Sequence, residues 1–135
     1  MKRVTREMIQ LYNLGELGCD FMGYVFDQKS QLTFHHLVVP KRMGGKMSIE
    51  NGAILHGDTS HPYLHLIESK QRDVFEYITR EMMEMNAKGC LELINLIRIH
   101  EAMREFEAIH GDERLSSGQK ILTMAHPSKR IDFRR

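Results

Sequence analysis

Two histidines, His61 and His65, are four positions apart at the start of a predicted helix, so their rings lie on one face, one turn apart. Such a pair can bind one metal ion. A third imidazole, from His35 or His36, would complete a three-ligand site that keeps coordination positions open for water and substrate. The spacing of these histidines therefore predicts a metal site at which a substrate and water could react.

His35 and His36 are adjacent in a β-prone run, so their side chains point to opposite faces of the predicted strand. One of them can be a metal ligand, which leaves the other free as a general base, because a neutral imidazole accepts protons near pH 7. Asn51 lies in the loop between strand and helix, where its side-chain amide could orient an imidazole. The spacing alone leaves open which of the two histidines is the base.

The elements that must hold these residues follow from apolar runs and turn signals. Residues 21–26 and 32–39 are both β-prone, and a turn-like segment separates them, so a hairpin is expected. Pro40 ends the second run, and the loop of residues 40–50 contains a Gly-Gly pair. Residues 53–56 form a further short strand. His35 and His36 are thus placed on a strand and Asn51 in a loop.

The spacing of apolar residues also predicts three helical regions, within residues 1–20, over 64–85 and over 91–109. Potential capping residues at 58–60 precede the long middle helix. Gly89 and Gly111 follow the second and third helices, where glycine is favoured. The chain therefore combines a small amount of strand with a mainly helical second half.

These residues, in this order, resemble the HNH endonuclease motif of the ββα-metal nucleases, most closely its colicin-type members. The matching segments are TFHHLVVPKR at 33–42, ENGAIL at 50–55 and SHPYLH at 60–65. The resemblance extends over residues 21–75, about 40% of the chain. It implies a ββα-metal core in which a hairpin, a loop and a helix carry the site.

The resemblance also implies a role for each matching residue. His35 and His61 would be metal ligands, and His65 would bind either the metal or a phosphate oxygen. His36 would be the general base that takes a proton from the attacking water. Asn51 would fix the loop and hold the base through its side-chain oxygen.

Lys41, Arg42 and Lys46 lie in the loop between the base and Asn51, where they would contact phosphates without reading sequence. The whole chain is nearly neutral, with 19 Lys and Arg against 18 Asp and Glu, so any nucleic-acid surface must be local. Residues 112–135 form a basic tail, which could be a DNA-contacting arm or simply solvated.

One feature of many HNH endonucleases is missing from this sequence. The two cysteines, Cys19 and Cys90, form no CxxC pair, so the structural zinc of those relatives has no cysteine ligands here. His56 and Ser60 stand about where one such pair would be, but one added ligand does not rebuild a zinc site. The domain must therefore hold together by packing, through its long helices.

With 135 residues, 41% of them apolar and 27% charged, the chain is expected to form one globular α+β domain. Its parts are an N-terminal helix (1–20), a ββα-metal (HNH) core with the hairpin (21–75), a helical extension (76–111) and the basic tail (112–135). No apolar run follows the basic N-terminus, and no stretch is long enough to span a membrane, which favours a soluble cytoplasmic protein.

The expected function is metal-dependent hydrolysis of DNA phosphodiester bonds, with one divalent metal ion and a histidine base. Mg²⁺ or Mn²⁺ is the expected working ion, and Zn²⁺ or Ni²⁺ are alternatives because imidazole favours them. No base-reading module is recognisable, so a protein partner could supply specificity. Two other interpretations stay open: an inactive metal-stabilised DNA-binding or regulatory module, and a structural zinc protein whose histidines only fold the chain.

Overall fold

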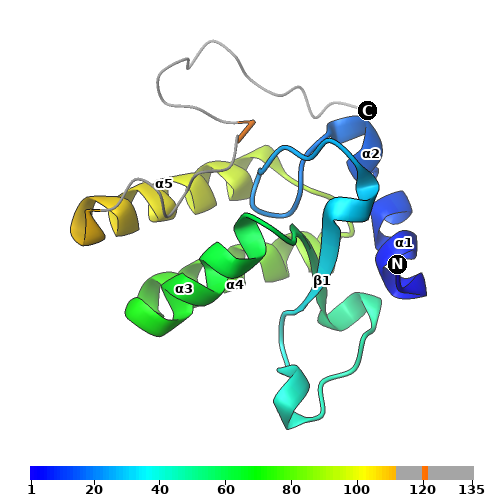
Figure 1. Cartoon of the computed structure of the whole chain (residues 1–135), viewed down its shortest axis with the longest axis horizontal. Helices are drawn as coiled ribbons and strands as arrows, with labels where there is room; N and C mark the ends of the chain where they lie inside the picture. The colour runs from blue at the N-terminus through cyan, green and yellow to red at the C-terminus, as the bar shows by residue number, and fades with distance from the viewer. Residues whose placement is uncertain (112–119, 122–135) are drawn as a thin grey trace.

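The computed structural model describes residues 1–111, 120 and 121 (Figure 1). These residues form five α-helices and a two-stranded antiparallel sheet, in the order α1 (Arg3–Leu11), α2 (Leu14–Leu17), β1 (Leu32–His36), β2 (Gly52–His56), α3 (Ser60–Lys70), α4 (Arg72–Lys88) and α5 (Leu93–His110). The expected α+β class is therefore confirmed. The expectations for the basic tail lie outside the described residues, except at 120 and 121.

The hairpin has a different partner strand from the one we expected. β1 pairs with β2, from Leu32 opposite His56 to His36 opposite Gly52, and residues 21–26 form no strand. The reason lies in Asp20, whose Oδ1 accepts the N–H groups of Met22 and Tyr24 and so holds this segment in a turn. The predicted pairing of 21–26 with 32–39 is wrong, and the true hairpin encloses the loop of residues 37–51.

The single long helix expected over residues 64–85 is two helices. α3 ends at Lys70 and α4 begins at Arg72, because Gln71 between them takes an extended conformation (φ −151°, ψ 88°). Residues 68–73 are all polar, so the chain can turn here while Ile67 and Val74 on either side stay buried. The expected helix ends at Gly89 and Gly111 are confirmed, both with positive φ (74° and 67°).

The helices and the hairpin share one hydrophobic core. α4 packs against both α3 and α5, and α1 contacts both strands (Figure 1). Methionines fill much of this core, with Met82, Met85 and Met103 among its buried residues, as adaptable packing residues do. Among the described residues, no helix is both long and apolar enough to cross a membrane.

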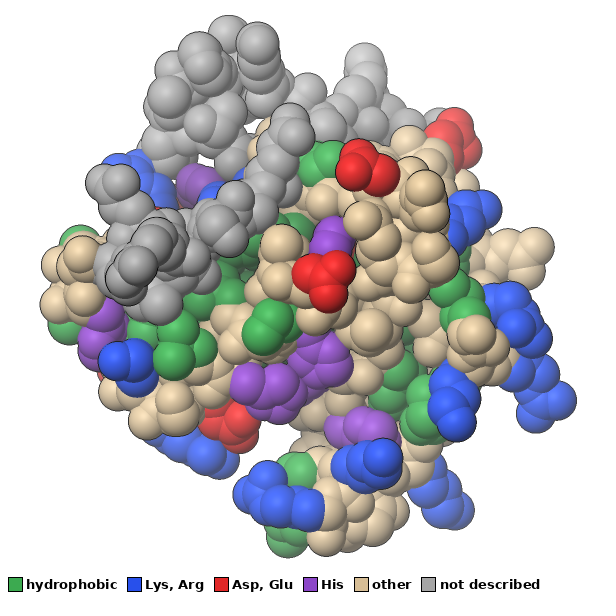
Figure 2. All heavy atoms as spheres, in the orientation of Figure 1, with side chains coloured by type: hydrophobic (Ala, Val, Ile, Leu, Met, Phe, Trp, Pro, Cys, Tyr) green, Lys and Arg blue, Asp and Glu red, His purple; other side chains and the backbone are tan. Residues whose placement is uncertain are grey.

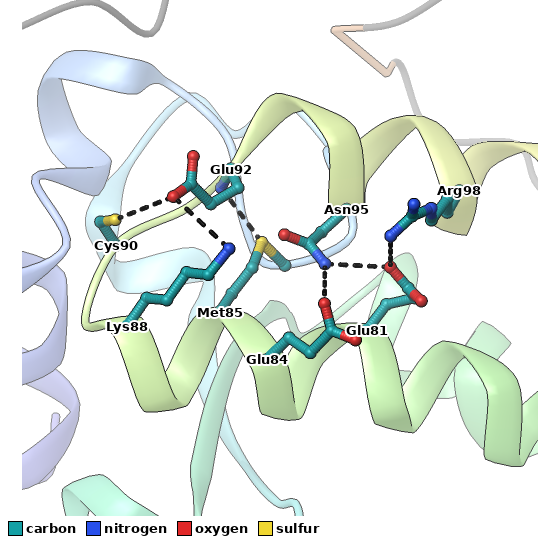
Figure 3. Close-up of polar contacts among 8 residues, drawn as sticks. All are labelled: Glu81, Glu84, Met85, Lys88, Cys90, Glu92, Asn95 and Arg98. Atoms are coloured by element: carbon teal, nitrogen blue, oxygen red, sulfur yellow. Dashed lines mark hydrogen bonds and ion pairs between the residues drawn. The ribbon is translucent and has the colours of Figure 1, made fainter.

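A polar network centred on the buried Asn95 and Glu81 joins α4 to α5 (Figure 3). Asn95 on α5 donates from Nδ2 to carboxylate oxygens of Glu81 (2.9 Å) and Glu84 (3.1 Å) on α4. Arg98 Nη1 lies 3.7 Å from the same Glu81 oxygen. Two acidic residues of the helical half, Glu81 and Glu84, thus help to hold the two helices together.

Candidate metal centre

Three histidines from two elements form a compact cluster. His35 projects from β1, and His61 and His65 project from one face of α3 with their rings stacked at 5.1 Å. One ring nitrogen from each lies within 4.8 Å of the other two, close enough to hold one metal ion. Within the described part of the chain, no other group of three or more His, Cys, Asp or Glu side chains meets this criterion. The predicted clustering of these three residues is therefore confirmed.

The neighbours of His61 and His65 fix which ring nitrogen faces the centre. The one hydroxyl hydrogen of Thr33 is donated to the Leu55 carbonyl (2.9 Å), so Thr33 Oγ1 accepts a hydrogen from His61 Nδ1 (2.8 Å). His65 Nδ1 donates to Glu68 Oε1 (3.1 Å), because a carboxylate only accepts. Both rings therefore keep the lone pair on Nε2 free for a cation, an arrangement typical of metal-bound histidines.

The residues present fit a divalent metal. His35 Nδ1 lies 3.4 Å from His61 Nε2, and two nitrogens bound to one tetrahedral zinc at about 2.0–2.1 Å would be about 3.4 Å apart. His35 is only 4% exposed, and its Nε2 has no hydrogen-bond partner within the described structure. Burial and the neighbouring histidines lower the pKa of His35 to about 3 and that of His61 to about 4. Neutral imidazoles whose ring nitrogens lie this close together favour a cation between them.

These pKa values predict how many protons a metal displaces. With values of about 3 and about 4, His35 and His61 are neutral at pH 6. Binding of Ni²⁺ at pH 6 should therefore release no proton from these two rings, and fewer in total than the roughly two protons that three histidines of ordinary pKa would release. Titration calorimetry in buffers of different ionisation enthalpy measures this number. Release of two or more protons would contradict a preformed neutral site.

Thr33 is expected to tune metal affinity although it does not contact the metal. Thr33→Val keeps the side-chain shape but removes the acceptor for His61 Nδ1, so the affinity for Zn²⁺ or Ni²⁺ should fall by about 10–100-fold. Thr79→Val is a matched control, because Thr79 lines the same cavity and its Oγ1 has no partner in the described structure. Equal affinities for the two variants would show that the Thr33 contact does not orient the ring.

His36, the predicted base, lies at the end of β1 beside this cluster. Its ring packs edge-on against Phe34 at 5.0 Å, on the strand face opposite His35, as the predicted alternation requires. It is half-buried, and a positive charge on His36 would lower the pKa of both His35 and His61. His36 is therefore close to the cluster without belonging to it, which suits a base better than a ligand.

Asn51 fixes the loop, as predicted, but its oxygen does not contact the His36 ring in the described structure. Oδ1 accepts the N–H groups of Val38 (2.9 Å) and Val39 (2.8 Å), and Nδ2 donates to the carbonyls of Val39 and Lys46 (both 3.0 Å). The side chain has then used its whole hydrogen-bonding capacity on backbone. The expected hydrogen bond between Asn51 and the His36 ring is therefore not formed here. Asn51 instead binds the backbone of Val38 and Val39, which follow His36.

A cavity of about 730 Å³ opens beside the cluster, and its lining includes all four motif histidines, His35, His36, His61 and His65. Basic side chains also line it: Lys2, Lys41, Arg42 and Arg72. Figure 2 shows histidines gathered on this face, with Lys and Arg side chains on the lobe beside them. Two of the three predicted phosphate contacts therefore border the site, whereas Lys46 is exposed on the same loop and is not in the lining.

Sequence reasoning missed Asp20, which anchors the start of α3. The side chain is fully buried, and its Oδ2 accepts hydrogen bonds from the His56 N–H (2.8 Å) and the Ser60 hydroxyl. Ser60 immediately precedes His61, so Asp20 positions the helix that carries two of the three clustered histidines. A lone carboxylate within the apolar run 19–24 was the signal that could have revealed it.

His56 is a structural residue of this anchor. It is buried, and its Nδ1 accepts the N–H of Asp58 at 3.1 Å. It does not belong to the group of histidines that could hold a metal. Hydrogen bonds around Asp20 thus hold this place in the fold together.

We compared the chain with protein-family models, with curated proteins and with solved structures, and nothing matched in any of the three comparisons. Function must therefore be argued from the site itself.

Proposed function

We propose that this protein is a metal-dependent endonuclease of the HNH type that hydrolyses DNA phosphodiester bonds. The observation that carries the proposal is the pairing of the three-histidine cluster with His36, which opens to the same cavity from the adjacent strand position. The order of His35, His36, Asn51 and His61 along the chain, which resembles the HNH motif, supports it. So does the basic rim formed by Lys41 and Arg42.

His36 would act on the attacking water. Its half-buried ring accepts the proton from water as the water oxygen bonds to phosphorus and the bond between phosphorus and the 3′ oxygen breaks. The departing alkoxide takes a proton from solvent, which gives a 5′ phosphate and a 3′ hydroxyl. A general base of this kind typically contributes about 10²–10⁴-fold to the rate.

The remaining residues would hold the substrate and the cofactor. A divalent cation bound by His35, His61 and His65 would supply charge neutralisation at the phosphate and stabilisation of the leaving oxygen. Lys41 and Arg42 would bind flanking phosphates, which fixes the backbone without reading bases. A protein partner would then be one source of target specificity. Imidazole ligands favour Zn²⁺ or Ni²⁺, while Mg²⁺ or Mn²⁺ remains the proposed working ion.

A plasmid-nicking assay with Mg²⁺, Mn²⁺, Ni²⁺ or Zn²⁺ added separately to chelator-treated protein tests the proposal. We expect conversion of supercoiled plasmid to nicked or linear DNA with at least one of these ions and none in EDTA. Plasmid that is bound but never cut, with any ion, would instead support the inactive binding module.

Thermal melts with and without chelator address the structural zinc alternative. We expect the chelator-treated protein to remain folded, because the hydrophobic core and the Asp20 anchor do not use the three clustered histidines. Loss of the cooperative transition on chelation would show that the histidines mainly fold the chain.

A further inference from the structure

The loop of residues 37–48, between β1 and β2, concentrates exposed apolar side chains. Val38, Val39, Met43 and Met47 are four of the ten large hydrophobic residues that are exposed among the described residues. Met43 is the most exposed of the ten, at 69%. In Figure 1 this cyan-to-teal loop projects away from the helices as a separate lobe. Apolar groups gathered on a projecting loop indicate a binding surface.

The 37–48 loop is held rigidly at its base. The four hydrogen bonds of Asn51 tie residues 38 and 39 to Lys46. Gly45 donates to the Pro40 carbonyl (2.9 Å), and a Cβ at Gly45 would lie 1.9 Å from the Val39 oxygen, so only glycine fits there. Met43 is therefore presented on a preformed tip, which lowers the entropy lost when it is buried against a partner.

Two cationic residues stand next to the apolar tip. Lys41 and Arg42 directly precede Met43 and line the cavity that contains the histidine cluster. An apolar side chain next to a Lys and an Arg is complementary to a base step, which is apolar and lies next to phosphates. Proteins that kink duplex DNA insert Met, Leu, Ile or Phe between base pairs in this way.

We infer that Met43 is a wedge that enters the stack of duplex DNA while Lys41 and Arg42 bind the adjacent phosphates. This inference rests on the proposed function, since it takes DNA as the occupant of the site. The wedge would bend the duplex towards the cavity and bring a backbone phosphate to the histidine cluster. Flexible pyrimidine–purine steps would be favoured as sites, because they unstack at the lowest cost.

Fluorescence of 2-aminopurine tests the wedge without any cleavage. A 12-base-pair duplex would carry 2-aminopurine in place of the adenine of a central T–A step, with EDTA present and saturation checked by anisotropy. We expect wild-type protein to raise the fluorescence, because unstacking relieves quenching. Met43→Ala should bind without this rise, and Met43→Leu should restore it. Met83→Ala removes an exposed methionine from α4 and should keep the full rise.

The outcomes separate this inference from the proposed function. Wild-type protein that binds the duplex without a rise, or a Met43→Ala protein that gives the same rise, would overturn the wedge even if plasmid is cut. If the loop binds a protein instead of DNA, we expect the wild-type protein to bind the duplex without a rise. Failure of wild type to bind the duplex would overturn it as well. A rise that depends on Met43, in a protein that cuts no DNA, would support the wedge and refute the nuclease.

Discussion

Replacing His36 with alanine should lower metal-dependent DNA cleavage by about 10²–10⁴-fold and leave metal affinity unchanged. The reason is the position of the ring. His36 opens to the cavity that contains the three-histidine cluster but packs against Phe34 on the other strand face. Its loss should therefore remove the proton acceptor and leave the ligands in place. Nicking rates and calorimetric metal titrations on the same preparation measure the two effects.

His35→Ala is the matched control, since it changes the same residue type one position earlier. His35 contributes a nitrogen to the cluster, 3.4 Å from His61 Nε2. This variant should therefore lose metal affinity, and it should lose cleavage as a consequence. If His36→Ala loses metal binding while His35→Ala retains it, the assignment of base and ligand is reversed.

Chemical rescue sharpens the test of His36. Added imidazole can occupy the space left by the missing ring and accept the proton from water, so it should restore part of the activity of His36→Ala. In His35→Ala, imidazole can restore activity only by replacing the lost ligand, so any rescue there should come with restored metal affinity. In His36→Ala, metal affinity should be the same with and without imidazole. A His36→Ala protein with wild-type cleavage would show that another group, or the solvent, takes the proton.

The histidine cluster could be predicted from the sequence because its geometry is mostly local. His61 and His65 share a helix face by spacing alone. His35 and His36 alternate across a strand by the same kind of rule. The pairing of β2 with β1, followed directly by α3, then brings the third ring to the pair. The contact from Thr33 to His61 was also within reach, since Thr33 lies two residues before His35 on the same strand face.

The partner of β1 could not be predicted, because β propensity does not choose between strands. Residues 21–26 are as apolar and β-prone as the segment 52–56 that pairs. The choice depends on Asp20. Its side chain accepts two N–H groups of the first segment, so these groups cannot pair with a neighbouring strand. That carboxylate has this effect only when buried against His56 and Ser60, far along the chain.

Asp20 should be among the residues on which stability depends most. Burial raises the pKa of its carboxyl, and the hydrogen bonds from Ser60, His56, Tyr24 and Met22 oppose that shift by favouring the charged form. Asp20→Ala would leave the Met22 and Tyr24 N–H groups without an acceptor. The His56 N–H and the Ser60 hydroxyl would keep only the hydrogen bonds that their two residues make with each other. An unpaired buried group costs about 1–3 kcal/mol, so the total should be about 3–5 kcal/mol or more. Urea unfolding in EDTA measures this loss without any contribution from metal binding.

Asp20→Asn distinguishes the lost acceptors from the lost charge. The amide oxygen can still accept from Met22 and Tyr24, and the Ser60 hydroxyl can accept from the new amide, so this variant should be more stable than Asp20→Ala. Asp58→Ala removes a nearby exposed carboxylate and should change stability by no more than about 0.5 kcal/mol. An Asp20→Ala protein as stable as Asp58→Ala would refute the anchor.

Metal affinity is a second measurement that tests the Asp20 anchor, and it connects the anchor to the histidine cluster. Ser60 begins α3 and directly precedes His61, so loosening its bond to Asp20 should let the helix start shift relative to His35 on β1. Asp20→Asn, measured where it is fully folded, should therefore bind Ni²⁺ more weakly than wild type, while Asp58→Ala binds normally. Unchanged affinity in a destabilised Asp20→Asn protein would mean that Asp20 supports the fold without positioning the histidines. In that case the packing of Leu64 and Ile67 in the core would be sufficient to place α3.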